Sequence, residues 1–458
     1  MAVQPTTPEE WLPVLTSRLD HRRTRIALLR SYTNGNAPLP EGGANVRAAW
    51  EAFQKKARTN LGSLVVDALA ERLICNGVTV GQSQNDDDTA RTIWRNNRMD
   101  VAVSDTIRDM LTVSIGYMVV GSYEGQPVVT SELPEFMYAA TDPLRPWVAR
   151  AAVKVWRDID VEKDYAYVWV PGLRQKFERP TFQTPDPSTR TVWSSAAGGW
   201  TLVEGSDERY KGAPPVVVFE NHDCMGEFEP HLDILDRINK DILDRLVTTA
   251  MQAFRQRYLE GGLPPTDENG NPIDYSSVFT PAPGALWELP EGVKLAETQE
   301  SAQSILAMLS TAKDDIRDLA AVTRTPIAML VPDGQNQSAA GSEFAKEGLV
   351  MKARDRIARI VPSLNEVMSI ALRVVNPEFA DVVNVGFSDP THVSFAEKYD
   401  AAVKAKSADV PWRTRMISIL GYSADEVDTM QTELEEERLA LQLAAPPAPV
   451  TVDATVAP

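Results

Sequence analysis

The sequence predicts an α+β protein in which long helices and an antiparallel sheet occupy separate parts of the chain. Apolar residues recur at helical spacing in residues 1–112 and again after residue 226, whereas between residues 113 and 222 the period changes to two. Turn-rich clusters, and not helices, separate the short β-rich runs of that middle part. Strands that follow one another in this way form an antiparallel sheet. With 458 residues the chain is long enough for two or more structural units.

The composition and net charge limit the classes of function that the chain can have. The chain is 43% hydrophobic and 24% charged, the balance of a folded protein, and it carries a net charge of −18. A protein that grips DNA is usually basic, because affinity comes largely from neutralising phosphates. The acidic balance therefore favours an enzyme or a structure past which DNA slides. The sequence contains no apolar run of about 18 residues and no signal-peptide pattern at its start, so we expect a cytoplasmic product with no membrane association.

Motifs that carry chemistry are missing. The two cysteines, Cys75 and Cys224, predict buried free thiols, and the four histidines have no partner at metal-ligand spacing. The triplet His222-Asp223-Cys224 suggests a Cys/His pair, but adjacent residues of an extended chain point to opposite faces. No phosphate-binding loop and no nucleophile elbow occurs. We expect no catalytic residue, no metal and no cofactor.

The first half of the chain is predicted to hold helices followed by strands. One helix is expected over Glu9–Tyr32 with Thr7 as its N-cap, a second over Asn60–Ile74, and a third after Asp88. The β-rich runs that follow are Val113–Tyr123, Val128–Thr130, Trp147–Trp156, Tyr165–Val170, Val192–Val203 and Pro215–Asn221.

Three long helices are predicted in the second half. Glu227–Leu259 is expected to be one helix of roughly 50 Å that ends at Gly261-Gly262. Glu300–Thr323 is the second. The third is predicted over Ser342–Val374, with Ser342 as its N-cap and a bend at Pro362. A returning strand over Val382–Phe387, a helical region over Phe395–Leu443 and a low-complexity tail over residues 444–458 follow.

Two turn-rich segments separate these helices. Residues 261–298 contain the hairpin signal Asn269-Gly270 and a small apolar set formed by Tyr275, Phe279 and Trp287 among others. Residues 325–341 contain two prolines and two glycines, which prevent a continuous helix. The tip of this second segment is polar and uncharged apart from one aspartate. We predict a loop built on Pro326, Asp333, Gly334, Gln335, Asn336, Gln337 and Ser338.

The order of elements, together with several passages, resembles the portal proteins of long-tailed double-stranded DNA phages, especially those of actinobacteria. These passages are Pro214–Asn221 running into Leu232–Asn239, Gln252–Tyr258, Tyr165–Val170 with Phe177-Glu178, and Thr325-Pro326 with Ser338–Glu343. The resemblance covers roughly residues 5–440.

The resemblance implies a subunit of a homo-oligomeric ring, twelve-fold in this family, at one capsid vertex. Double-stranded DNA would pass non-specifically through its channel. Large terminase, the head-completion adaptor, major capsid protein and scaffolding protein would be the partners, and assembly would take place in the host cytoplasm. The implied parts are a wing (1–225), stem helices (226–260 and 299–324), a clip for docking (261–298), a tunnel loop (325–341), a kinked helix with the returning strand (342–390) and a helical crown (391–443).

The second stem helix carries charges of both signs. Lys313, Arg317 and Arg324 lie within about 40° of each other around a helix, whereas Asp314, Asp315 and Asp318 lie farther round. In a ring each side chain becomes a circle of like charges, so this sparse basic stripe is a candidate guide for DNA. Ordinary helix-surface charges remain the alternative.

Two other functions stay open. Another structural minor capsid protein of a phage head would share this composition, and ring stoichiometry separates it from a portal. A soluble enzyme would instead show a deep pocket with converging polar groups.

Overall fold

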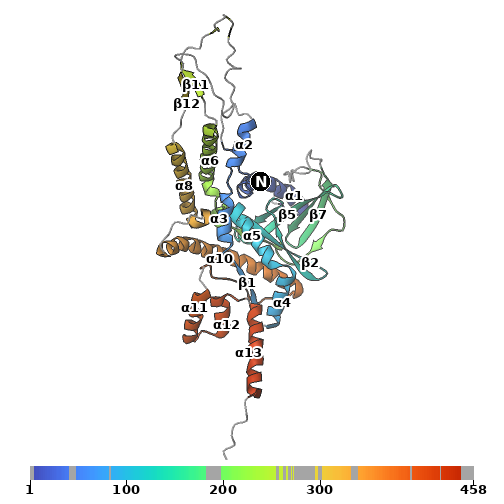
Figure 1. The fold of residues 1–458 in the computed structure, drawn as a ribbon. Coiled ribbons are helices and arrows are strands. Elements are labelled where there is room, and N and C mark those ends of the chain that lie inside the picture. Colours follow the sequence, from blue (N-terminus) through green and yellow to red (C-terminus); the bar gives the residue numbers. More distant parts are fainter. Residues whose placement is uncertain are drawn as a thin grey trace, which may run out of the picture.

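The computed structural model describes residues 5–40, 48–81, 84–181, 198–253, 257–260, 265–266, 270, 272, 294–297, 302–331, 339–391, 395–422 and 424–444. The molecule is elongated (Figure 1). A short strand pair and two helices extend from one side of a central body, and a helical unit extends from the other.

The chain begins with the helices α1 (Pro8–Thr33), α2 (Ala48–Ala57), α3 (Leu61–Ala70), α4 (Gln84–Asn96) and α5 (Met99–Val113). Thr7 caps α1 as predicted, because the N–H of Glu10 donates to Thr7 Oγ1 at 3.3 Å and the N–H of Thr7 donates to the Glu10 carboxylate at 3.2 Å.

Two predictions for this part are wrong. The third helix, expected after Asp88, is α4 and already begins at Gln84. The helix expected to reach Ile74 ends at Ala70, and Cys75–Val80 forms strand β1. Strand β1 pairs with β13 (Val383–Phe387), far along the chain. A partner so distant leaves no local signal in the sequence around β1.

The predicted antiparallel β region follows, and it is divided into two sheets. The three-stranded sheet has the order β10–β2–β3, and the six-stranded sheet runs β4–β5–β6–β7–β8 with β9 also paired to β7. The strands are β2 (Ile115–Tyr123), β3 (Gln126–Glu132), β4 (Met137–Thr141), β5 (Ala149–Asp158), β6 (Lys163–Val170), β7 (Leu173–Pro180), β8 (Thr201–Leu202), β9 (Glu208–Arg209) and β10 (Val216–Glu220). Of the run predicted over 192–203, only β8 is a strand, and residues 192–197 lie outside the described residues.

Two apolar clusters hold the body together. Helix α1 packs on one face of the six-stranded sheet, where Leu15 and Leu19 meet Val153, Val168 and Phe177. The larger cluster joins the three-stranded sheet to α3, α5 and α10. On the other face of the six-stranded sheet, cations stack on aromatic rings, with Lys176 Nζ 3.9 Å from the centre of the Tyr165 ring.

The first long helix is shorter than predicted. A 3₁₀ turn over Glu229–His231 precedes α6 (Leu232–Ala253), and β11 (Arg257–Glu260) pairs antiparallel with β12 (Lys294–Glu297). The 22 residues of α6 span only about 33 Å. The predicted stop at Gly261-Gly262 lies outside the described residues. Glu227 cannot open the helix, because its N–H donates to the carbonyl of Leu111 at 2.8 Å and ties it to the end of α5.

The remaining helices are α8 (Ala302–Thr323), α9 (Ile327–Leu330), α10 (Ala339–Val375), α11 (Phe395–Ser407), α12 (Trp412–Thr414), the π-helix η3 (Arg415–Leu420) and α13 (Ala424–Ala444). The predictions of α8, β13 and a helical C-terminal region are confirmed. Ser342 lies inside α10 and is not its N-cap. Pro362 also lies inside α10. The predicted tail lies outside the described residues from residue 445 onward. No helix within the described ranges has the length and apolarity that crossing a lipid bilayer requires.

Candidate functional site

Helices α6 and α8 lie side by side and extend away from the body (Figure 1). The buried residues of α6 include Leu235, Ile238 and Leu243, and those of α8 include Ala312 and Leu319. An ion pair crosses between the two helices, with Arg237 Nη2 2.7 Å from Asp315 Oδ1 and 3.4 Å from Asp318 Oδ2. Apolar packing and these charges together fix the pair at the end near the body.

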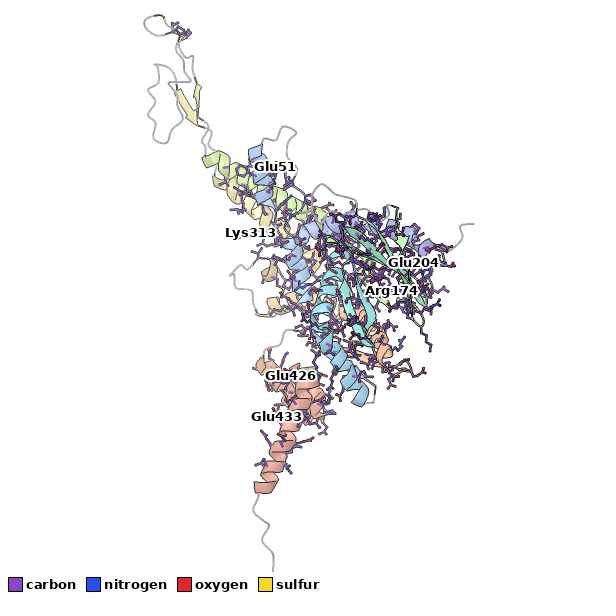
Figure 2. All side chains as sticks on the ribbon, turned by 90° about the vertical axis from the view of Figure 1, so that its right-hand side faces the viewer. Glu51, Arg174, Glu204, Lys313, Glu426 and Glu433 are labelled. Atoms are coloured by element: carbon purple, nitrogen blue, oxygen red, sulfur yellow. The ribbon has the colours of Figure 1, made fainter. Side chains whose placement is uncertain are left out.

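The three predicted DNA-facing cations are exposed, but they do not form one uninterrupted stripe. Lys313 and Arg317 lie on α8, and Figure 2 shows Lys313 on the outside of the helix pair. The Arg317 guanidinium is 2.5 Å from Asp314 of its own helix, which offsets its charge. Arg324 follows the end of α8 with φ 56°, a left-handed conformation, so it leaves the helical spacing on which the stripe was based.

Two carboxyl groups meet between the helices. Asp241 of α6 lies beside the buried Asp315 of α8, and within the described residues the Oδ2 atom of each is buried without a hydrogen-bond donor. Burial and the negative charge of Asp315 raise the pKa of Asp241. Arg237 offsets part of this repulsion.

The segment after α8 begins as a tight turn. Thr325 is buried, its N–H donates to the carbonyl of Ala320 at 2.9 Å, and Pro326 precedes the short helix α9. This geometry closes the end of α8 and turns the chain toward α10. The predicted loop tip, from Asp333 to Ser338, lies outside the described residues, as does Pro332.

A buried cluster at Glu227 joins the helix pair to the body. The Glu227 side chain is only 2% exposed, and its carboxylate lies 2.6 Å from Lys352 Nζ and 2.7 Å from Arg356 Nε, both of α10. Asn221 Nδ2 donates to the same carboxylate at 3.0 Å. Burial acts to raise the pKa of Glu227, but the two cations outweigh it and hold the pKa below its ordinary value. We call these four residues the junction.

Lys352 extends the junction to α8. Its Nζ also donates to the carbonyl of Thr323 at 2.9 Å, on the last residue of α8. One ammonium group therefore holds both the segment that leads into α6 and the end of α8. The neighbouring Gly226 makes this possible, because a Cβ there would lie 2.2 Å from the carbonyl oxygen of Thr112.

The turn-rich segment at the far end of the pair is only partly described. Thr266 and Pro272 form an antiparallel bridge, and Gly270, which lies between them in the chain, has a positive φ of 79°. Asn269 itself lies outside the described residues, as do Tyr275, Phe279 and Trp287.

The His222-Asp223-Cys224 triplet is not extended, so the expectation that its adjacent side chains point to opposite faces of an extended chain is wrong. It forms a 3₁₀ turn in which Asp223 and Cys224 have positive φ. Cys224 is exposed, not buried, and its thiol lies 2.8 Å from a Glu220 carboxylate oxygen, which raises the pKa of the thiol. A nucleophilic cysteine needs the opposite shift. Across the described ranges, no three metal-ligating side chains gather at one point.

Sequence patterns did not reveal the junction. Lys352 and Arg356 are one helical turn apart beside an apolar stripe, a spacing equally typical of solvent-exposed helix charges. The one available signal was Gly226 immediately before Glu227, which marks a close approach of the backbone.

Comparison with known proteins gives a consistent result. Residues 14–440 match the family model described as phage portal protein, SPP1 Gp6-like. The portal protein of Mycobacterium phage D29 is 26% identical over 420 residues, which cover 86% of this chain and 82% of that protein. The portal protein of Mycobacterium phage L5 is 25% identical over 435 residues, which cover 89% and 84%.

The comparison with solved structures gives matches to chains of gene transfer agent particles. A chain of the native virion has a TM-score of 0.41 and 12% identity, and the match covers 88% of this chain and 99% of that one. A chain from the neck of the native particle, computed with C12 symmetry, has a TM-score of 0.42 and 10% identity over 87% and 99%.

Proposed function

The chain belongs to the family of SPP1 Gp6-like phage portal proteins, and we propose that twelve copies of it form a ring around an axial channel for double-stranded DNA. The family match over residues 14–440 is the observation that carries this proposal. The chain is thus a portal protein, a structural component of the virion and the head–tail connector of its phage.

The shape of the subunit supports a ring. Helices α6 and α8 extend from the body as a pair, and two helices alone cannot cover all their apolar surface. Val322 of α8 and Met351 of α10 are 46% and 49% exposed near the end of this pair. Neighbouring copies in a closed ring would cover such surface without leaving a free end.

We assign the parts of the ring as follows. Residues 1–225 form the wing, 226–260 and 299–324 the stem, 261–298 the clip, 342–390 the kinked helix with the returning strand, and 391–443 the crown. The loop at 325–341 lines the narrowest part of the channel, and Lys313, Arg317 and Arg324 face the passing DNA. The net charge of −18 supports passage without tight binding, because a strongly basic lining would hold the phosphates.

The partners follow from this arrangement. The strand pair β11–β12, which flanks the clip in the sequence, lies at the end of the stem away from the body (Figure 1), and the clip is the proposed docking surface for large terminase and later for the head-completion adaptor. Major capsid and scaffolding proteins would surround the wing during assembly in the host cytoplasm. The subunit itself carries out no catalysis in this scheme.

Imaging of the purified protein by cryo-electron microscopy tests the proposal. We expect twelve-fold rings with an axial channel wide enough for duplex DNA. A monodisperse monomer at micromolar concentration over a range of salt concentrations would overturn the ring. A closed shell fragment or an irregular multimer would instead favour a minor capsid protein.

A further inference from the structure

The two carboxyl groups between α6 and α8, those of Asp241 and Asp315, need a hydrogen-bond donor that ionised side chains cannot supply. Asp315 is only 7% exposed, and within the described residues the Oδ2 atoms of both side chains are buried without a donor. The two groups are within hydrogen-bonding reach of each other. An ionised carboxylate only accepts hydrogen bonds, so two of them cannot satisfy each other. One proton held between them would give both oxygen atoms a partner.

The charges around the pair also favour one bound proton. Arg237 Nη2 lies 2.7 Å from Asp315 Oδ1 and 3.4 Å from Asp318 Oδ2, so one guanidinium faces three carboxyl groups. Burial and the negative charge of Asp315 raise the pKa of Asp241, which is the direction that retains a proton. Two carboxyl groups in contact titrate as a unit, because ionising both places like charges side by side.

The other ionisable groups of the packed elements do not neutralise the pair. Asp244, one turn beyond Asp241, adds negative charge and is itself paired with Lys240. Arg245, also one turn beyond, forms no ion pair with either carboxyl group within the described residues. Helix α2 meets α6 at Asn239, on the opposite side from Asp241. The remaining ionisable side chains lie on other faces or nearer the body, and they are Glu51, Lys55 and Lys56 on α2, Glu229 and His231 before α6, Asp233 and Asp236 on α6, and Lys313, Asp314 and Arg317 on α8.

The pair lies where the packing between the two helices changes. Toward the body the apolar side chains between α6 and α8 are buried, among them Leu235 and Leu319. Away from the body, in the direction of β11 and β12 (Figure 1), several are only half-buried, and these are Leu246, Val247, Met308 and Leu309. The outer parts of the two helices therefore depend more on the contact between Asp241 and Asp315 than the inner parts do.

We propose that Asp241 and Asp315 share one proton and form a pH-sensitive latch, which holds the outer parts of α6 and α8 together while the proton is bound and loosens them when it leaves. The two Oδ2 atoms are buried within one subunit, so the latch needs no neighbouring copy and does not rest on the proposed ring. Because α6 and α8 lead to the strand pair β11–β12, loosening the latch would change how firmly that end of the molecule is held.

Asp241→Asn tests the shared proton, because its amide group donates permanently to Asp315 and cannot titrate. The measurement is hydrogen exchange of the amides in residues 243–253 of the full-length chain between pH 4 and pH 8, corrected for the chemical exchange rate at each pH. The folded chain retains the proton above about pH 4, the ordinary pKa of an aspartate, so protection is lost as pH rises through the folded pKa. We expect the corrected exchange of the unmodified chain to rise by about fivefold or more, and that of Asp241→Asn to change by less than about twofold.

The matched control is Asp314→Asn, which removes the same charge from the neighbouring position of α8. Asp314 is exposed and lies 2.5 Å from Arg317, so we expect this variant to follow the pH profile of the unmodified chain. An unmodified chain with corrected exchange that does not change with pH, or equally flat profiles for both variants, would overturn the latch. Protection that returns at pH 8 on addition of calcium chloride would also overturn it, because the pair would then hold a metal ion in place of a proton. None of these results bears on ring formation, which electron microscopy decides separately.

Discussion

Two regions of the molecule are attached to the body by the same chemistry in different surroundings. At the junction, the Glu227 carboxylate meets the two cations Lys352 and Arg356. At the C-terminal unit, the Asp428 carboxylate of α13 meets Arg413 of its own unit and Arg91 of α4, with Arg91 Nη1 at 2.6 Å. In both cases one anion meets two cations, which both lie on α10 at the junction and on two different helices, α4 and α12, at the C-terminal unit.

Burial separates the two attachments. Glu227 is 2% exposed, whereas Asp428 is 37% exposed. Water screens an exposed ion pair and leaves it with little net effect, whereas removing one partner of a buried pair strands a charge that water cannot reach. The same three-residue motif therefore makes a rigid connection at the stem and a labile one at the C-terminal unit.

A third carboxylate, Asp109, shows that the number of neighbouring cations also decides in which direction the pKa of a buried carboxyl group shifts. Asp109 of α5 is buried and lies 2.6 Å from Arg30 Nη2, but Arg30 is shared with Glu135. Burial outweighs this single shared cation and raises the pKa of Asp109 to about 6. Glu227, also buried but with two cations, shifts in the opposite direction.

The largest effect is expected at the junction. Glu227→Gln keeps the shape of the side chain but leaves Lys352 buried without a carboxylate partner, and it leaves Arg356 with only the more exposed Asp355. We expect a loss of about 3–5 kcal/mol in the free energy of unfolding of the dissociated subunit, measured by denaturant titration. The control is Glu204→Gln. Glu204 is exposed in the turn between β8 and β9 (Figure 2), so this change should alter the free energy of unfolding by less than about 0.5 kcal/mol. A loss below about 1 kcal/mol at Glu227 would remove the contrast with Asp428.

Much of the fold was predictable because its signals are local. The capping pair Thr7 and Glu10, the apolar spacing of α8 and the alternation in β6 each lie within a short stretch of sequence. The resemblance to portal proteins then supplied the family, which the match over 14–440 confirms.

The errors at β1 and β11 share one physical cause, which is strand pairing with residues distant in the chain. Residues Arg257–Glu260 continue a helical pattern but pair with Lys294–Glu297 instead. Cys75–Val80 pairs with Val383–Phe387. The junction likewise brings Glu227 to residues of α10 more than 100 positions away. No periodicity within a short window encodes these contacts.

The second largest effect is expected in the pH dependence of the free energy of unfolding, in which Asp109 should differ from Glu227 and Asp428. Between about pH 4, the ordinary pKa of an aspartate, and its folded pKa of about 6, the folded chain holds a proton that the unfolded chain has released. Stability from this group therefore falls as pH rises through that window and stays low above it. Asp109→Asn cannot titrate. Relative to that variant, the unmodified subunit should lose on the order of 2 kcal/mol between pH 4 and pH 7.

Denaturant titrations of both proteins across this range provide the measurement. A constant stability difference between them would show that Arg30 already keeps Asp109 ionised, and that one shared cation suffices. The opposite slope, with stability gained as pH rises, would place Asp109 in the same class as Glu227.

The smallest effect is expected at the C-terminal unit. Although partial burial of Asp428 opposes ionisation, Arg413 and Arg91 lower its pKa, so its contribution is present at neutral pH and disappears as pH falls through the lowered folded value. Asp428→Asn should cost only about 0.2–1 kcal/mol, because the group is exposed and screened. The measurable consequence is local, with faster hydrogen exchange in α13 of the dissociated subunit and unchanged exchange in α4 and β2. The difference should shrink at high salt, since screened pairs weaken first. Faster exchange throughout the body would mean that the Asp428 ion pairs stabilise the whole subunit, as the junction at Glu227 does. Burial would then not explain a difference between the two attachments.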